Sequence, residues 1–257
     1  MTEPRRPPRD TQRSRLYRAE TPVAGRRFET LADCMRFADS VVGTLWWEAR
    51  FPERGLGGIP RLRPGQGARQ AFYRVDPDGP TITLPRRYRT SGVLLHELAH
   101  WALDDDADLP NHGRTFARLL LDATAEFGGV ARADALLASY REHRVHVGRP
   151  ARLGPDGRWR YGWDERLRLG KGRALAIRFS TTGDPHAEAS GVFEGYRRGA
   201  SVLRLLADDG AVTIPARSVW DVRPVALAPL ASGGARVAAV DLALPLGGVH
   251  VAVGPVE

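Results

Sequence analysis

The sequence contains very little cysteine, since Cys34 is the only one among 257 residues. One cysteine cannot form an internal disulfide, and such a chain suits a reducing compartment. Long apolar runs are absent too, so we expect no transmembrane helix, which needs about 18 consecutive apolar residues. The N-terminus carries charge and proline in place of the apolar segment of a secretion signal. We therefore expect a cytoplasmic protein without a membrane partner.

Lysine is almost absent as well. Lys171 is the only one, so the formal net charge of +8 comes almost entirely from arginine. No block of five or six like charges is present. Arginine is frequent within residues 1–15, which we expect to form a disordered basic arm. Contact of this arm with nucleic acid or an acidic surface is the less favoured alternative.

The most informative motif is HELAH at positions 96–100, an instance of the HExxH pattern. Residues four apart lie on one face of a helix, so His96 and His100 can direct two ring nitrogens at one point. Neutral imidazole is a good ligand for Zn²⁺, and Glu97 is placed to take a proton from a zinc-bound water. These three residues form the core of a metal-dependent hydrolase.

The helix that carries this motif is predicted to be buried. Residues 93–102 are mostly apolar, and Thr90 or Ser91 is suited to the N-cap position. Imidazole and carboxylate groups in such a helix need partners, because an unpaired buried polar group costs about 1–3 kcal/mol. A metal ion would supply that partner.

A catalytic zinc site usually has a third protein ligand and leaves its fourth position to water. The candidates after the motif are His112, Glu126 and the acidic residues Asp104, Asp105, Asp106 and Asp108. We prefer His112, because it lies in a turn that opens a second helix, with Asn111 as the expected cap. The aspartates are assigned to a solvated loop or to orienting the ligand imidazoles. Glu126 lies deep in the following helix and fits less well.

The stretch from Leu16 to about Val147 resembles the small zinc metallohydrolases of high-GC actinobacteria and, more distantly, the SprT-type zincin metallopeptidases. The resemblance is carried by LYRAE at positions 16–20, the HELAH helix and HGRTF at positions 112–116. In those families a His-Gly pair followed by an aromatic residue supplies the third zinc ligand and a packing anchor. The resemblance therefore implies that His112 is a ligand and that Phe116 lies in the core.

The predicted elements of residues 16–149 follow the order of a zincin-like domain. A capping box at positions 30–33 begins a helix that is predicted to reach about Trp47. Strands precede the motif helix and two helices follow it; the strands are predicted at 59–62, 71–75 and 81–84, and the helices at 114–127 and 131–144. The strand at 72–75 is our candidate for the sheet edge that holds an extended peptide.

Residues 150–257 are predicted to form a separate β-rich domain, because the helical period disappears after Pro150. Five short β-like segments are separated by turn residues and lie at 174–179, 191–196, 202–206, 211–214 and 219–222. They suggest a small all-β barrel of the SH3-like or Sm-like type. The fold class is therefore α+β, with a basic arm (1–15), a zincin-like metallohydrolase domain (16–149) and this β-rich domain.

Two classes of function agree with these observations. The favoured one is a zinc-dependent hydrolase, in the first place a metallopeptidase acting on a peptide or protein substrate, with Glu97 as general base. Its subsidiary version is a protease acting on DNA-bound proteins. The alternative is a metal-stabilised binding module, with nucleic acid as a partner, in which the zincin domain is an idle scaffold. Glu97 argues against that alternative, because an idle scaffold needs no base. The residue that stabilises the oxyanion stays open among six candidates, Tyr73, Tyr88, Tyr140, Arg141, His143 and His146.

Overall fold

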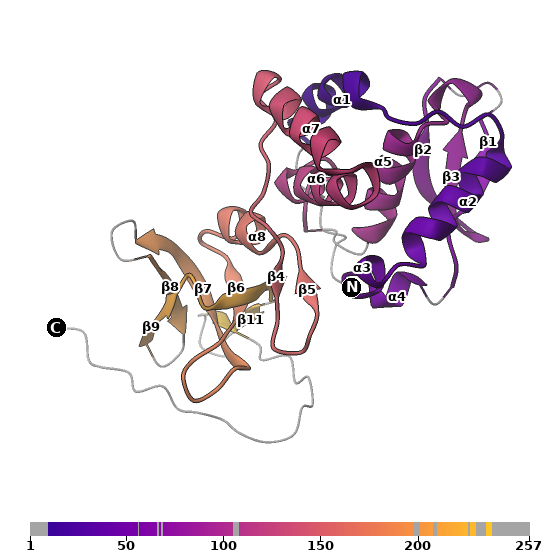
Figure 1. The fold of residues 1–257 in the computed structure, drawn as a ribbon. Helices are drawn as coiled ribbons and strands as arrows, with labels where there is room; N and C mark the ends of the chain where they lie inside the picture. The colour runs from indigo at the N-terminus through magenta and orange to yellow at the C-terminus, as the bar shows by residue number, and fades with distance from the viewer. Residues whose placement is uncertain are drawn as a thin grey trace. The chain divides into compact units, whose positions relative to one another are not determined.

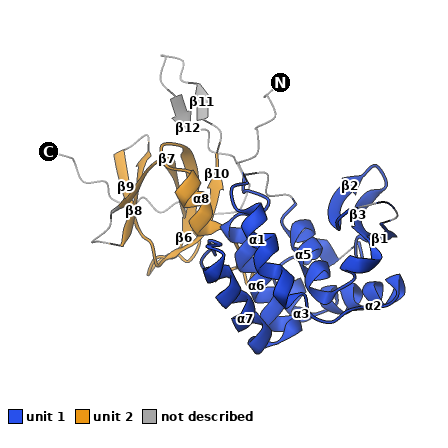
Figure 2. Ribbon diagram, turned by 90° about the horizontal axis from the view of Figure 1, so that it is seen from above, with its two compact units in different colours: residues 1–150 blue, residues 151–257 orange. Residues whose placement is uncertain are grey.

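The computed structural model describes most of the chain in two compact units. The described residues are 10–225 without positions 56, 66, 68, 105–107, 198–200 and 208–209, together with 227–229 and 235–237. Unit 1 comprises residues 1–150 and unit 2 residues 151–257 (Figure 2). Both contain helices and sheet, so the fold class is α+β as predicted. In the described part of the chain, no helix is long and apolar enough to cross a membrane.

Unit 1 combines seven α-helices among its described residues with a small mixed sheet. The helices are α1 (Arg13–Glu20), α2 (Leu31–Val42), α3 (Leu45–Glu48), α4 (Pro52–Gly55), α5 (Ser91–Ala102), α6 (Arg114–Gly128) and α7 (Val130–Glu142), with 3₁₀ turns η1 (Thr21–Val23) and η2 (Arg86–Tyr88). The strands are β1 (Arg61–Pro64), β2 (Phe72–Asp76) and β3 (Gly79–Leu84). Helix α5 lies between the sheet and α6, so its two faces are covered by different layers (Figure 1).

The sheet of unit 1 has the order β1–β3–β2. Strand β1 is parallel to β3, and β2 is antiparallel to β3, which it joins through a tight turn between Asp76 and Gly79. Strand β2 is thus an edge strand, as predicted, and it contacts α5. The strand predicted at 59–62 begins two residues later than expected.

The motif helix is buried, as predicted. The Thr90 side chain accepts a hydrogen bond from the Val93 N–H at the start of α5, and Leu94 and Leu98 are fully buried. Phe116 on α6 is also in the core. The expected cap of α6 is wrong, however, because Gly113 is the N-cap residue and makes no side-chain cap. A glycine N-cap is nearly as favourable as a threonine N-cap.

The helix predicted to reach Trp47 is in fact two helices. The capping box of Thr30 and Asp33 is present, so the start of α2 is confirmed. The helix ends at Gly43, and the Thr44 side chain then accepts a hydrogen bond from the Trp47 N–H as the N-cap of α3. The N-cap at Thr44 begins a separate helix. The apolar residues continue through this break, so their spacing in the sequence does not reveal it.

The predicted basic arm is not wholly disordered, because α1 begins at Arg13. Gln12 is buried, and its side-chain amide donates to the His146 carbonyl at 3.1 Å and accepts from the His146 N–H at 2.9 Å. Leu16 and Ala19 are fully buried, and the Ser139 hydroxyl donates to the Ala19 carbonyl at 2.8 Å. These contacts attach α1 to α7 and the segment after it. Positions 1–9 of the arm lie outside the described residues.

Unit 2 contains the five predicted strands. They are β6 (Ala174–Phe179), β7 (Ala187–Arg197), β8 (Val202–Ala207), β9 (Gly210–Pro215) and β10 (Val219–Pro224), in an antiparallel sheet of order β10–β6–β7–β8–β9. Short hairpins are formed by β4 (Arg152–Leu153) with β5 (Trp159–Arg160), and by β11 (Leu227–Pro229) with β12 (Ala235–Val237).

Two expectations for unit 2 need correction. The sheet is open within the described residues, since its end strands β9 and β10 do not pair, so a closed barrel is not found. The unit is also not all-β, because helix α8 (Trp163–Leu169) places Trp163 and Leu167 in the core beside the strands. Seven residues between Gly162 and Gly170 are too few to display a helical period in the sequence.

The close packing at the start of α5 can be tested with Gly92→Ala. The Gly92 N–H donates to the Ala24 carbonyl at 2.8 Å, and a Cβ at Gly92 would lie 2.7 Å from that oxygen. We expect overpacking to cost about 1–3 kcal/mol, more than the gain in helix propensity. Thermal unfolding should show a lower Tm. Gly55→Ala is the control, because a Cβ there meets nothing within 4 Å; equal melting temperatures for the two variants would contradict the predicted clash.

Candidate metal centre

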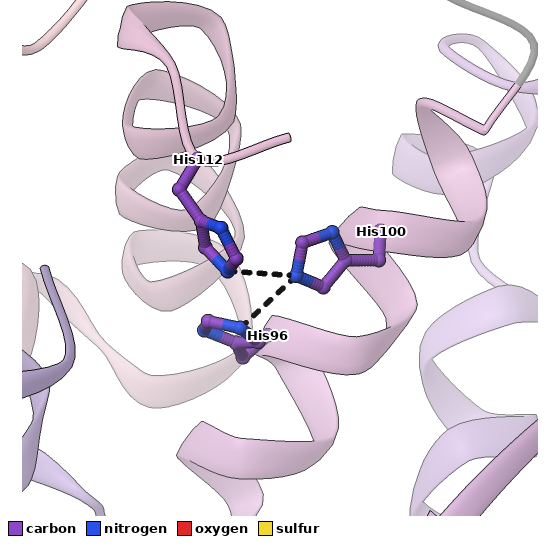
Figure 3. A group of neighbouring side chains, drawn as sticks. All are labelled: His96, His100 and His112. Atoms are coloured by element: carbon purple, nitrogen blue, oxygen red, sulfur yellow. Dashed lines mark hydrogen bonds between the residues drawn. The ribbon is translucent and has the colours of Figure 1, made fainter. Parts of the chain in front are cut away.

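Three histidines converge in the core of unit 1 (Figure 3). His96 and His100 lie one turn apart on α5, and His112 lies directly before α6. The Nε2 atom of His100 lies 3.1 Å from Nε2 of His96 and 3.1 Å from Nε2 of His112. The Phe116 ring packs against all three imidazoles, with centroid distances of 4.9, 4.4 and 5.1 Å. The structure thus brings together all three predicted ligands.

The donor set fits a metal ion. Ligand nitrogens in a tetrahedral site with bonds of about 2.0–2.1 Å lie about 3.3 Å apart, close to the observed separations. His96 and His112 are buried, so their ring nitrogens are shielded from water. Each uses its Nδ1 hydrogen elsewhere, which leaves Nε2 with a lone pair directed at the others. Lone pairs of neighbouring Nε2 atoms repel one another, and a cation between them would replace this repulsion by attraction. The cluster could therefore hold a metal ion.

Two carboxylates orient these imidazoles, and the sequence analysis missed both. The Nδ1 of His96 donates to Glu20 at 2.8 Å, and the Nδ1 of His112 donates to Asp10 at 2.6 Å. A carboxylate behind a ligand histidine fixes its tautomer and makes the other nitrogen a better ligand. Glu20 belongs to the LYRAE stretch that carries the family resemblance. That stretch does not indicate that Glu20 accepts a hydrogen bond from His96.

Burial and neighbouring charges set the protonation of the cluster. Burial and the charges of His96 and His112 hold the pKa of His100 well below its usual value. Burial also lowers the pKa of His112 to about 4, against the opposing effect of Asp10. Burial acts to lower the pKa of His96, but the Glu20 carboxylate outweighs it and the net shift is upward. His100 and His112 are therefore neutral at pH 7, the form that binds metals.

Glu97 lies beside the cluster on the buried side of α5. Burial raises the pKa of Glu97 to about 7, although His96 and a hydrogen bond from the Tyr73 backbone N–H act to lower it. That N–H belongs to the edge strand β2, so the sheet edge directly orients this carboxylate. A carboxylate with a pKa near 7 is suited to both accepting and returning a proton.

Two cavities meet at this point. A mainly apolar cavity of about 490 Å³ is lined by His96 and by residues such as Val93 and Leu136. A polar cavity of about 310 Å³ is lined by His100 and His112. Glu97, Tyr17 and Gln70 line both cavities. A bound molecule that extends from one cavity into the other therefore passes Glu97.

The other candidates from the sequence lie elsewhere or act differently. Glu126 is exposed on α6 and is no member of the cluster. Asp104 accepts a hydrogen bond from the Tyr73 hydroxyl at 3.1 Å, and Asp108 is also outside the cluster. Asp105 and Asp106 lie outside the described residues. Tyr140 is fully buried and lines neither cavity, so it cannot reach a substrate there.

Comparisons of the chain with models of protein families, with curated proteins and with solved structures gave no match. What the centre does must therefore be inferred from its own residues.

We predict that the protein binds one divalent metal ion per chain and that His112→Ala weakens this binding by more than about 100-fold. The reason is that losing a ligand should cost more than losing an outer partner, which typically costs 10–100-fold. Metal content by mass spectrometry, after dialysis against a chelator, measures the effect. His143→Ala is the control, since His143 lies at the end of α7 and contacts the Ser139 carbonyl. A His112→Ala protein that retains its metal would remove His112 from the ligand set.

The two outer carboxylates give a second prediction. We expect Asp10→Asn and Glu20→Gln each to lower metal affinity by about 10–100-fold, because each variant keeps the size of the side chain but weakens the orienting hydrogen bond. Competition with a chromophoric chelator measures the affinity. The exposed Glu29→Gln serves as the control. Affinities equal to that of the wild type would show that the carboxylates have no role in metal binding.

Proposed function

We propose that the protein is a zinc-dependent hydrolase, in the first place a metallopeptidase, with Glu97 as its general base. The observation that carries this proposal is the position of Glu97. Its carboxylate lies beside three converging imidazole nitrogens and lines both cavities. A purely structural metal site has no use for an ionisable group at the junction of two cavities.

The ligand set supports zinc in a catalytic role. Structural zinc sites are closed by four protein ligands, whereas catalytic sites have three and keep one position open. Within the described residues, the cluster contains three such ligands. When bound, zinc would polarise a substrate carbonyl and make a water molecule more acidic. Imidazole also binds copper, iron and nickel, so the identity of the metal is part of the proposal.

Glu97 performs the proton transfers of the proposed reaction. It accepts a proton from the water that attacks the substrate carbonyl, and then gives that proton to the amine that leaves. The Tyr73 backbone N–H holds the carboxylate in place. Burial raises the pKa of Glu97 to about 7, which supports a group that can both accept and return a proton.

The edge strand supports a peptide as the substrate. Strand β2 ends the sheet, and Phe72, Tyr73 and Arg74 line the polar cavity. An extended peptide can add to such an edge through its main-chain hydrogen bonds. The same strand orients Glu97, so a peptide paired with β2 would lie beside the base. The apolar cavity would then accept an apolar side chain of that peptide.

We extend the proposal to the fold of each unit. The sheet before α5 and the helices after it support a zincin-like unit 1, related to the metallohydrolases that the sequence resembles. The antiparallel strand order β10–β6–β7–β8–β9 supports an Sm-like or SH3-like arrangement of the strands in unit 2, in open form.

We predict that Glu97→Gln lowers the hydrolytic rate by about two to four orders of magnitude while zinc stays bound. Glutamine keeps the shape of the side chain but cannot accept the proton. Digestion of proteome-derived peptides, with a chelator control, would identify cleavable substrates and measure the rate. Glu126→Gln is a matched control, because Glu126 is exposed on α6. Full activity in Glu97→Gln would overturn the mechanism, and a zinc-loaded wild type that cleaves nothing would favour the binding module.

A further inference from the structure

Helix α1 turns one face toward the metal centre. Arg13, Tyr17 and Glu20 are spaced by four and three residues, which places them on the same side of the helix, and Asp10 lies three residues before Arg13. Glu20 and Asp10 are bonded to His96 and His112. The two residues between them, Arg13 and Tyr17, make no such bond, although they lie over the same cluster.

Tyr17 covers the imidazoles. Its ring stacks on that of His96 with a centroid distance of 5.2 Å and an interplanar angle of 22°, and it meets the His112 ring edge-on, also at 5.2 Å. Tyr17 lines both cavities together with Glu97. A phenol has an ordinary pKa of about 10, so the Tyr17 hydroxyl carries a proton at neutral pH that it can donate to an acceptor.

Arg13 lies next to Tyr17 and lines the polar cavity. Its guanidinium carbon is 5.5 Å from the Tyr17 ring centroid. Arg13 and Tyr17 both line the polar cavity, so the guanidinium and the phenol form a pair of hydrogen-bond donors at its wall.

The guanidinium of Arg13 is placed where it can meet an anion. Arg13 is exposed and lines the polar cavity, and none of the ion pairs among the described residues joins it to a carboxylate. Tyr17 and Glu97 line the same cavity. A negative charge that develops there would be attracted to the Arg13 guanidinium by Coulomb's law.

We propose that Arg13 and Tyr17 are catalytic residues that stabilise the negative charge developing on the substrate carbonyl oxygen. This inference rests on the proposed hydrolase function. As the water oxygen bonds to the carbonyl carbon, Glu97 takes its proton and the carbonyl π electrons move to the oxygen. The Arg13 guanidinium and the Tyr17 hydroxyl donate to that oxygen. When the C–N bond breaks, its electron pair leaves with the nitrogen, which takes the proton from Glu97. The electron pair on the oxygen re-forms the carbonyl.

The experiment compares Tyr17→Phe and Arg13→Gln with Arg18→Gln. Arg18 is exposed on the same helix and donates to the Ser14 carbonyl, so its substitution is the control. With a peptide that the wild type cleaves, we expect kcat to fall by about 10²–10³ in the first two variants, as for loss of one oxyanion donor. KM and zinc content should be unchanged, which a defect in folding or metal binding would not allow.

A second measurement is independent of turnover. Inorganic phosphate, as an anionic probe, is titrated calorimetrically into zinc-loaded Glu97→Gln protein with and without Arg13→Gln or Tyr17→Phe. We expect each added substitution to weaken phosphate binding by at least about tenfold. If the wild type cleaves no peptide, the proposed hydrolase fails, while weaker phosphate binding would still identify the pair as an anion site. Unchanged kcat, or unchanged phosphate affinity, in Tyr17→Phe and Arg13→Gln would overturn the inference.

Discussion

Three imidazoles directed at one point inside an apolar core form an arrangement that the rest of unit 1 must support. Each ring needs a partner for its second nitrogen, because a buried polar group without one is costly. Glu20 and Asp10 supply two of these partners from 76 and 102 residues away in the chain. The start of the described chain, the motif helix and the beginning of α6 are therefore held together by one cluster of hydrogen bonds.

This arrangement makes α1 part of the centre. The helix is attached to α7 and the segment after it by Gln12 and Ser139, and to the imidazoles by Asp10 and Glu20. Metal binding would favour the orientation of both histidines and hence the position of α1, so part of the binding free energy would stabilise the fold. The same helix carries Arg13 and Tyr17 into the cavity next to Glu97.

Strand β2 lines the polar cavity together with His100 and His112. It is an end strand of its sheet, and its backbone orients Glu97. A segment bound along this edge would meet Glu97, the three histidines and the Arg13–Tyr17 pair in one place. The proposed reaction depends on how these elements come together more than on any one residue.

The sequence by itself determined the features that depend on local order. The four-residue spacing of His96 and His100 acts through the pitch of one helix, and the short β-like segments separated by turn residues within 174–222 predicted five strands that the structure contains. What only the tertiary structure decided depends on contacts between distant segments. Asp10 and Glu20 became partners of the ligands because α1 packs across α7, although composition placed the first residues of this region in a disordered arm. Within the described residues the sheet of unit 2 is open, because its end strands β9 and β10 do not pair. Closure depends on the tilt and register of strands far apart in the chain, which the sequence of each short segment does not specify.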